Sequence, residues 1–237
     1  MTPRVLVIVN SASSGPRRLG TWLREKAIDV DEVVGAEQPL PASLDGYAGL
    51  VMLGGGLMPD DDDRAPWLAA ERALAAEAID RDLPTLGICL GGQLLAHVAG
   101  GEVAEKTGPI ERGATPIRPT AAGRADALFA ALGDEAPMIE NHQDMITRLP
   151  TAAVLLATSA DVENQAFRLG ARVRGVQFHP EASAADLARW DDAALRGEGR
   201  SLPALIAAAE RVHDHNTAAS RALIEAFADE VRAGVPV

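Results

Sequence analysis

The sequence predicts an α/β fold built on a central, mostly parallel β-sheet that is flanked by helices. Up to Cys89, short apolar runs alternate with segments of helical periodicity, which is the pattern of parallel strands joined by crossover helices. From Glu102 the chain contains more strands with few helices between them, and after Glu181 it is helical again. We therefore expect a parallel half, a small antiparallel strand-rich addition in the second half, and a helical C-terminal segment.

The first half contains apolar runs that are typical of strands, separated by helical patterns. The expected strands are Arg4 to Val9, Val30 to Val34, Leu50 to Leu53 and Leu83 to Cys89. The expected helices are Pro16 to Ala27, Ala65 to Arg81 and Gln93 to Ala99. Pro66 suits the first turn of the second helix, because a proline there loses no hydrogen bond. We expect Ser11 to Gly15 to be a plain strand-to-helix connection.

The second half is expected to add strands and then helices. The expected strands are Val103, Thr115 to Ile117, Met138 to Ile139, Val154 to Thr158, Gln165 to Leu169 and Val173 to His179. The expected helices are Ala184 to Leu195 and Leu202 to Ala233, with a loop at Gly197 to Arg200. No linker rich in Ser, Gly or Pro divides the chain. We therefore expect a single domain over residues 1–237, in which residues 182–237 form a helical C-terminal extension.

Composition excludes several classes of partner. The formal net charge is -12 and the isoelectric point is near 4.8, so the chain repels nucleic acid and anionic lipid. We expect no nucleic-acid partner and no membrane partner. The single cysteine excludes an internal disulfide, and the apolar stretch at the N-terminus is too short for a signal or membrane helix. We expect a cytoplasmic protein.

Cys89 lies between an apolar run and a glycine-flanked helical segment, which indicates a strand that ends in a sharp turn with the thiol at its apex. The N-terminal end of the following helix favours thiolate over thiol. Further along, His179 and Glu181 project to the same side of an extended segment, and Pro180 keeps His179 out of helical geometry. The Glu181 carboxylate can then accept from Nδ1–H of the ring, leaving Nε2 to face the sulfur. Cysteine, histidine and acid together suit acyl transfer.

A site for the developing oxyanion is also present. The segment Gly54-Gly55-Gly56 follows an expected strand and can present bare backbone N–H groups to negative charge. The N–H of Leu90, at the start of the helix after Cys89, is the natural second donor. Asp60 to Asp63 is expected to be a solvated loop that caps the next helix, and no cluster has the spacing of metal ligands, so no metal is expected.

Three motifs together resemble the class I, triad-type, glutamine amidotransferases: Gly54-Gly55-Gly56, Gly87 to Gln93 and His179-Pro180-Glu181. The resemblance runs from Arg4 to Glu181 and is strongest to stand-alone proteins similar to the amidotransferase domain of GMP synthetase. It implies a three-layer, flavodoxin-like fold and an enzyme without a cofactor. In this family the cysteine attacks the side-chain amide of glutamine, forms a γ-glutamyl thioester and releases ammonia for a synthetase.

The same resemblance assigns residues. Cys89, His179 and Glu181 would be the catalytic triad, and the N–H groups of Gly55 and Leu90 would form the oxyanion hole. The substrate-binding residues would be Gln93, Asn141, His142, Gln143 and Asp144. Two positions depart from the family pattern: Gly56 replaces a common proline, and Gln143 replaces a usual glycine. No ATP-pyrophosphatase phosphate loop is present, so a synthetase would have to be a separate polypeptide that acts in trans.

Three hypotheses remain from the sequence. The first is a glutaminase that supplies ammonia to a separate synthetase partner. The second is a stand-alone hydrolase of γ-glutamyl peptides or amides with the same triad and a larger leaving group. The third is a thiol-based stress or binding protein on the related flavodoxin-like scaffold, which the spacing of His179 and Glu181 disfavours because a sensor needs no oriented imidazole.

Overall fold

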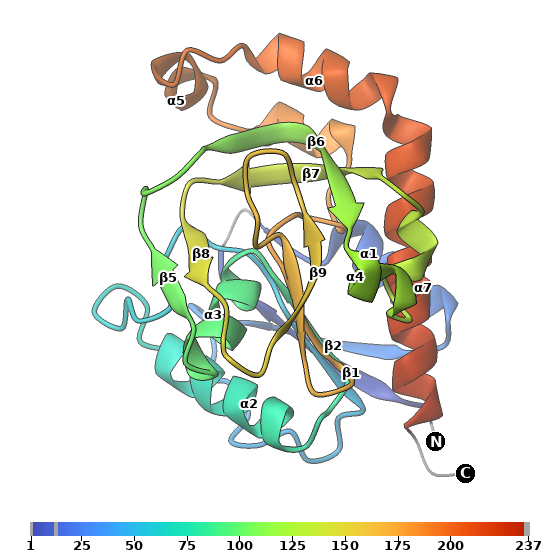
Figure 1. Cartoon of the computed structure of the whole chain (residues 1–237). Helices are drawn as coiled ribbons and strands as arrows, with labels where there is room; N and C mark the ends of the chain where they lie inside the picture. Colours follow the sequence, from blue (N-terminus) through green and yellow to red (C-terminus); the bar gives the residue numbers. More distant parts are fainter. Residues whose placement is uncertain (1, 12–13, 235–237) are drawn as a thin grey trace.

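The computed structural model describes residues 2–11 and 14–234, so the middle of the connection expected at Ser11 to Gly15 lies outside the described residues. Within them, one sheet of nine strands has the order β2-β1-β3-β4-β11-β10-β9-β6-β7 (Figure 1). The parallel part consists of β1 (Arg4–Val9), β2 (Asp29–Val34), β3 (Gly49–Met52), β4 (Thr85–Ile88) and β11 (Val173–Val176). The antiparallel part consists of β10 (Ala166–Leu169), β9 (Val154–Thr158), β6 (Glu111–Pro119) and β7 (Ala136–His142). A small second sheet pairs β5 (Glu102–Ala104) with β8 (Met145–Arg148).

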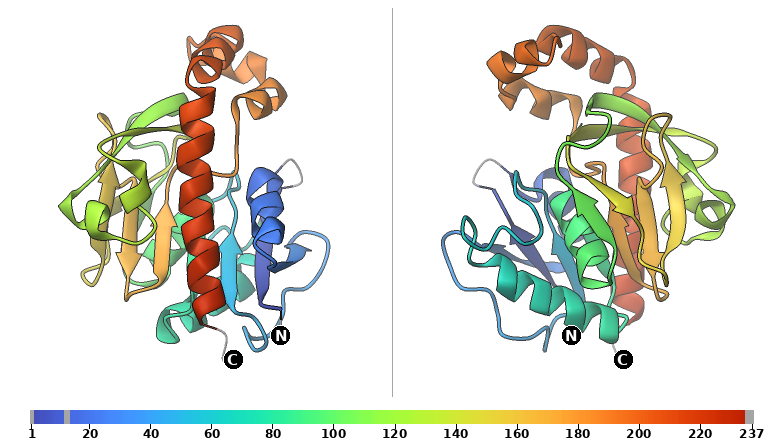
Figure 2. Two further views of the ribbon diagram at one scale, coloured as in Figure 1. Left: turned by 90° about the vertical axis from the view of Figure 1, so that its right-hand side faces the viewer. Right: turned by 60° about the vertical axis from the view of Figure 1, so that its left-hand side comes forward.

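Helices cover both faces of the sheet, which confirms the predicted three layers. The α-helices are α1 (Arg17–Glu25), α2 (Leu68–Asp80), α3 (Leu90–Val98), α4 (Ala121–Ala125), α5 (Asp192–Gly197), α6 (Leu202–Arg211) and α7 (His213–Ala233). Short 3₁₀ helices are η1 (Ala130–Leu132) and η2 (Ala184–Arg189). The long α7 lies along one face with α1, and α2 and α3 lie on the opposite face (Figure 2). No helix in the described part of the chain is long and apolar enough to span a bilayer.

Strand β1 shows why the sequence encodes a sheet that is covered by helices on both faces. Its side chains alternate between two separate cores: Val5 and Val7 pack with residues of α1 and α7, whereas Leu6 and Ile8 pack with residues of α2 and α3. A strand that is buried on both faces has no position for polar residues, so it forms a continuous apolar run. The predicted parallel α/β arrangement follows directly from this feature.

Several predicted boundaries were wrong, and tertiary contacts explain them. Helix α3 begins at Leu90 and not at Gln93, immediately after Cys89. Strand β11 ends at Val176 because His179 leaves the ladder and donates its backbone N–H to the carbonyl of Ile139 at 2.8 Å. The helix expected from Leu202 to Ala233 is interrupted at Val212, and the one expected from Ala184 to Leu195 is split into η2 and α5. Strand β8 and helices α4 and η1 were not predicted.

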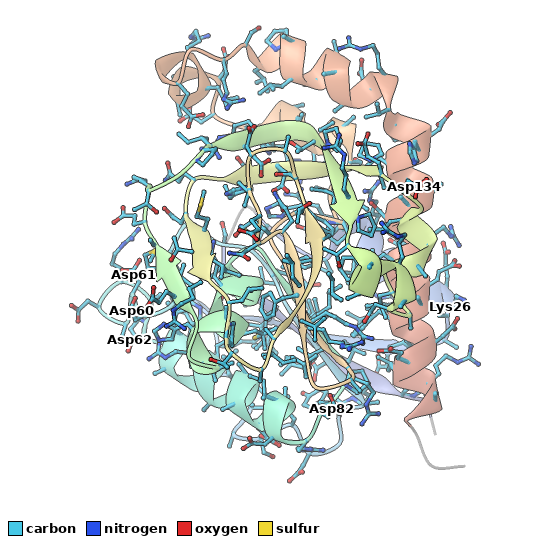
Figure 3. All side chains as sticks on the ribbon, viewed as in Figure 1. Lys26, Asp60, Asp61, Asp62, Asp82 and Asp134 are labelled. Atoms are coloured by element: carbon cyan, nitrogen blue, oxygen red, sulfur yellow. The ribbon has the colours of Figure 1, made fainter. Side chains whose placement is uncertain are left out.

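The acidic loop Asp60 to Asp63 lies at the outer edge of the molecule, as its labelled side chains show (Figure 3). It was expected to cap the following helix, but α2 begins at Leu68 without a side-chain cap. The loop carboxylates pair with arginines instead: Asp62 accepts from Arg72 at 2.7 Å, and Asp61 accepts from Arg64 at 2.8 Å. A turn at residues 66–67, closed by the hydrogen bond from Leu68 N–H to the Ala65 carbonyl, separates the loop from the helix.

The C-terminal helix packs into the main body of the molecule. The buried face of α7 contributes Leu223, Ile224, Phe227 and Val231 to the same core cluster as β1 and α1. Asn216 of this helix also donates a hydrogen bond to the carbonyl of Pro137 at 3.0 Å. The segment predicted to be a helical extension therefore shares the core of the sheet.

Candidate active site

Cys89 occupies the sharp turn that the sequence predicts between β4 and α3. Its φ of 52° and ψ of -109° place it in a backbone region that non-glycine residues rarely adopt. A β-carbon on Gly91 would overlap the backbone carbonyl of Met52, so only glycine allows α3 to start this close to β3. The turn holds the Cys89 side chain at the wall of a cavity, 8 % exposed.

His179 and Glu181 meet Cys89 at this turn. The Nδ1 of His179 lies 2.7 Å from Oε1 of Glu181, and because a carboxylate only accepts, the ring donates from Nδ1–H. Gly54 shows how close the ring and the thiol are: a β-carbon there would lie 2.9 Å from Cε1 of His179 and 3.3 Å from Cβ of Cys89. Within the described residues, Nε2 of His179 is buried without a hydrogen-bond partner and is therefore available to the thiol proton.

The electrostatics of the site favour a protonated imidazole. Burial alone lowers the pKa of His179, but the adjacent Glu181 carboxylate and the neighbouring Cys89 sulfur act in the opposite direction and prevail. The pKa of His179 is raised well above 6.5 as a result. A protonated ring beside the sulfur is the arrangement that stabilises a thiolate.

The structure adds Gln177, which the sequence analysis missed. Its amide Nε2 donates to Sγ of Cys89 at 3.5 Å. Gln93 fixes the orientation of this amide, since Nε2 of Gln93 donates to Oε1 of Gln177 at 3.2 Å and to the carbonyl of Asp144 at 3.0 Å. A signal was present in the sequence: Gln177 precedes His179 by two residues in the strand expected from Val173 to His179, and alternate residues of a strand project to one side.

The predicted oxyanion donors lie beside the thiol. Gly55 lines the same cavity as Cys89, and among the described residues its N–H donates no hydrogen bond. Leu90 is the first residue of α3, whose opening N–H groups have no partner within the helix. Both groups are therefore available to a negatively charged oxygen.

A buried network supports the oxyanion loop from behind. Asn10 donates from Nδ2 to the carbonyl of Leu53 and to Oε1 of Glu71, each at 3.0 Å, and accepts from Nε1 of Trp67 at 2.8 Å. Burial raises the pKa of Glu71 to about 8. Asn10 packs directly against the loop, because a β-carbon on Gly55 would lie 3.0 Å from the Asn10 β-carbon.

Two cavities meet at Cys89. The first has a volume of about 190 Å³ and includes all five predicted substrate residues. Its lining residues are Gly55, Gly56, Cys89, Gln93, Arg112, Asn141, His142, Gln143 and Asp144. The second has a volume of about 240 Å³, contains His179 and Glu181, and extends to Arg189 and Trp190. Asn141 lines both cavities.

The structure divides the predicted substrate-binding segment between the end of a strand and the loop that follows it. Asn141 and His142 are the last residues of β7, whereas Gln143 and Asp144 follow it in a loop. The ring of His142 turns away into the protein interior, where Nε2 contacts Oε2 of Glu111 at 2.8 Å. The His142 side chain is 1 % exposed, so its ring supports the cavity wall from the protein interior.

Glu111, Glu140 and His142 form the one group in the described part of the chain with atoms spaced as metal ligands could be, all within 4.8 Å. Ser159 and Gln165 donate hydrogen bonds to Glu111 at 2.7 Å and 2.5 Å. Burial, together with the charge of Glu111, raises the pKa of Glu140 well above 4.5, which favours its neutral form. Both oxygens of Glu111 already accept hydrogen bonds or contact the His142 ring, so we describe the group as a buried polar cluster behind the site.

The fold and this site define an α/β enzyme in which a cysteine, a histidine and a glutamate converge at the end of a parallel sheet. The family model for class-I glutamine amidotransferases matches residues 18–188. The chain belongs to the class-I glutamine amidotransferase family, whose members are hydrolases with a cysteine nucleophile.

Relatives and solved structures agree with this assignment. The chain is 31 % identical to a subunit of the glutamine-hydrolyzing GMP synthase of Thermoplasma acidophilum, over 74 % of this chain and 83 % of that one. It is 31 % identical to γ-glutamyl peptidase 5 of Arabidopsis thaliana, over 65 % of this chain and 61 % of that protein. The first curated relatives, GMP synthases of Porphyromonas gingivalis, are 38 % identical over 60 % of this chain, which spans about a quarter of their length (26 %). A glutamine amidotransferase structure from Thermotoga maritima superposes with a TM-score of 0.86 at 28 % identity, covering 97 % of this chain and 99 % of that one.

Proposed function

We propose that this enzyme hydrolyses the side-chain amide of glutamine through a γ-glutamyl thioester on Cys89 and supplies the ammonia to a separate synthetase polypeptide. The observation that carries the proposal is the meeting of Cys89, His179 and Glu181 at one turn, with Nδ1 of His179 held at 2.7 Å from Glu181. Cys89 is far in the sequence from His179 and Glu181, and a cysteine nucleophile is activated when a histidine lies beside the thiol and an acid orients that histidine.

The reaction begins when the Cys89 thiolate attacks the amide carbon. The carbonyl oxygen becomes an oxyanion, which accepts hydrogen bonds from the N–H groups of Gly55 and Leu90. Protonated His179 gives its proton to the departing ammonia, and Glu181 keeps the ring oriented by accepting from Nδ1–H. Water then attacks the thioester with His179 as the base, and glutamate and the free thiol are released.

The smaller cavity suits the amino-acid end of glutamine. It is lined by one cation, Arg112, and one carboxylate, Asp144, which together complement a zwitterion. Glu198, at the end of α5, holds the Arg112 guanidinium with contacts of 2.8 Å and 3.1 Å, so the C-terminal helices support this pocket. We assign Gln93, Asn141, Gln143 and Asp144 to substrate binding on this basis.

A synthetase partner in trans agrees with the comparisons. The Thermoplasma relative is named as one subunit of a glutamine-hydrolyzing GMP synthase, and the chain covers 83 % of it. Ammonia produced by this chain would then be used by a second polypeptide.

The test measures ammonia and glutamate released from L-glutamine by the purified protein. We expect Cys89→Ala to abolish release, and Glu181→Gln to reduce kcat less than His179→Ala, because Glu181 orients the ring and transfers no proton. Circular dichroism spectra of the three variants control for folding. Release that persists in Cys89→Ala would overturn the proposal.

Hydrolysis of larger γ-glutamyl amides is the second candidate function. The second cavity, of about 240 Å³, favours it because ammonia needs far less room. One relative is named a γ-glutamyl peptidase.

A further inference from the structure

The two cavities that meet at Cys89 have different chemical linings. In the proposed function, the smaller one holds the amino-acid end of the γ-glutamyl group, which places the departing amine in the larger one. Outside the catalytic residues, the lining of the larger cavity includes two arginines, Arg17 and Arg189, and Trp190. Glu181 is its one acidic lining residue within the described chain, and its Oε1 is already bonded to His179.

In the described part of the chain, the local structure leaves the Arg189 side chain without a carboxylate partner. Arg189 ends the short helix η2, three residues after Asp186, and residues three apart lie on the same side of a 3₁₀ helix. Asp186 would be the natural partner, but its Oδ2 accepts from the backbone and the hydroxyl of Ser183, both at 2.8 Å. Its Oδ1 faces Arg17 at 3.4 Å. Among the described residues the Arg189 side chain makes no ion pair or hydrogen bond, and Arg189 is exposed at the cavity.

We propose that the larger cavity is a leaving-group subsite for γ-glutamyl amides whose amine carries a carboxylate, and that Arg189 contacts this carboxylate. The inference rests on the proposed function and names the substrate class of the same site. A guanidinium recognises a carboxylate with paired hydrogen bonds, and Trp190 offers a flat wall for the carbon atoms next to it. Arg17, paired with Asp186, adds positive charge at the same wall.

The reaction balances with water as the co-reactant. Sγ of Cys89 bonds to the γ-carbonyl carbon, the carbon–nitrogen bond breaks, and the amine leaves with a proton from His179. Water then adds to the thioester carbon and the carbon–sulfur bond breaks. The products are glutamate, an amine that bears a carboxylate, and the free thiol.

The experiment compares two substrates of nearly equal size, γ-glutamylglycine and γ-glutamylglycinamide, with L-glutamine as a third. Glutamate release reports all three reactions. We expect kcat/KM to be at least about ten-fold higher for γ-glutamylglycine than for γ-glutamylglycinamide, as a charge-assisted contact predicts. In Arg189→Gln, this ratio should fall to within about two-fold of unity, because the cation is lost while the side chain keeps its polarity.

Arg196→Gln is the matched control. Arg196 lies on α5, is exposed, and pairs with Asp192 outside the cavity. We expect this variant to keep both the ratio and the rate with L-glutamine. An equal rate with the two glycine compounds, or a ratio that survives Arg189→Gln, would overturn the subsite while leaving glutamine hydrolysis intact. No glutamate from any of the three substrates would overturn the proposed function, and the subsite with it.

Discussion

Gln177 donates a hydrogen bond from its amide Nε2 to the sulfur of Cys89 across 3.5 Å. The amide oxygen of Gln177 accepts a hydrogen bond from Nε2 of Gln93. The same Nε2 also donates to the backbone carbonyl of Asp144 in the proposed substrate pocket. The sulfur is thus connected through two buried amides to the wall of that pocket. This connection orients the sulfur and links it to the residues that would contact the substrate.

Gln177→Met should slow the reaction without unfolding the protein. Methionine has a similar length but no N–H donor, so a thiolate would lose one charge-assisted hydrogen bond. Such a bond is worth about 1.5–3 kcal/mol, which corresponds to roughly a 10- to 100-fold loss of kcat/KM for glutamine. The exposed Gln38→Met is the control for the same chemical change. An unchanged kcat/KM in Gln177→Met would show that the amide has no influence on the sulfur.

Gly54→Ala should impair activity far more than Gly56→Ala. The new methyl group at position 54 would lie 2.9 Å from the His179 ring and 3.3 Å from Cβ of Cys89, whereas among the described residues, chain neighbours aside, no atom lies within 4 Å of the corresponding position at Gly56. Displacement of a reacting group by ~1 Å costs on the order of 10²-fold in rate. Steady-state kinetics and thermal unfolding of both variants provide the comparison. Equal activities would mean that the ring and the thiol have room to move apart without loss.

The protonation of His179 should depend on Glu181. The pKa of His179 is raised well above 6.5 in the folded protein, so its charged form stabilises the fold below the ordinary pKa, and this contribution is lost as pH rises through the raised value. In Glu181→Gln the carboxylate is replaced by a neutral amide, and the pKa of His179 should fall. Nitrogen NMR of the imidazole ring over a pH series measures this directly. A titration that is the same in both proteins would exclude Glu181 as the cause.

Glu71 should make the protein less stable as pH rises from about 4.5 to about 8, since burial raises its pKa from 4.5 to about 8. In that interval the folded protein holds a proton that the unfolded chain has lost, so stability falls by about 1.4 kcal/mol per pH unit. Glu71→Gln keeps an oxygen acceptor for Asn10 and removes the titration. Urea unfolding between pH 5 and 8 should therefore give a flatter stability profile for the variant. Parallel profiles would show that Glu71 is ionised throughout.

Phe227→Ala tests whether the chain forms one domain. Phe227 is fully buried on α7 in the core shared with β1 and α1. Its truncation should cost about 3–5 kcal/mol. In a single domain, circular dichroism and tryptophan fluorescence should report one coincident transition at a lower midpoint. The exposed Arg232→Ala on the same helix is the control, and a shift in only one of the two probes would indicate separate units.

Most strands and several helices could be predicted because their signals are local. The apolar run along β1, for example, depends only on residues that are neighbours in the chain. The structure has a strand at this run, buried on both faces. Helical propensity alone placed the regular part of α3 too late, from Gln93, because two glycines oppose a helix just before it. The close packing of Gly91 on Met52 overrides that propensity.

The sequence by itself determined the parallel α/β architecture and the three motifs that carry Cys89, His179 and Glu181, since these depend on patterns a few residues long. Only the tertiary structure decided that Gln177 donates to the sulfur and that the His142 ring is buried against Glu111. It also decided that Asp186 is occupied by Ser183 and Arg17, which leaves the Arg189 side chain at the cavity without a partner among residues 2–11 and 14–234. Each of these outcomes depends on which polar groups compete for the same partner in space, and that competition is set by the packing of segments that the sequence keeps apart.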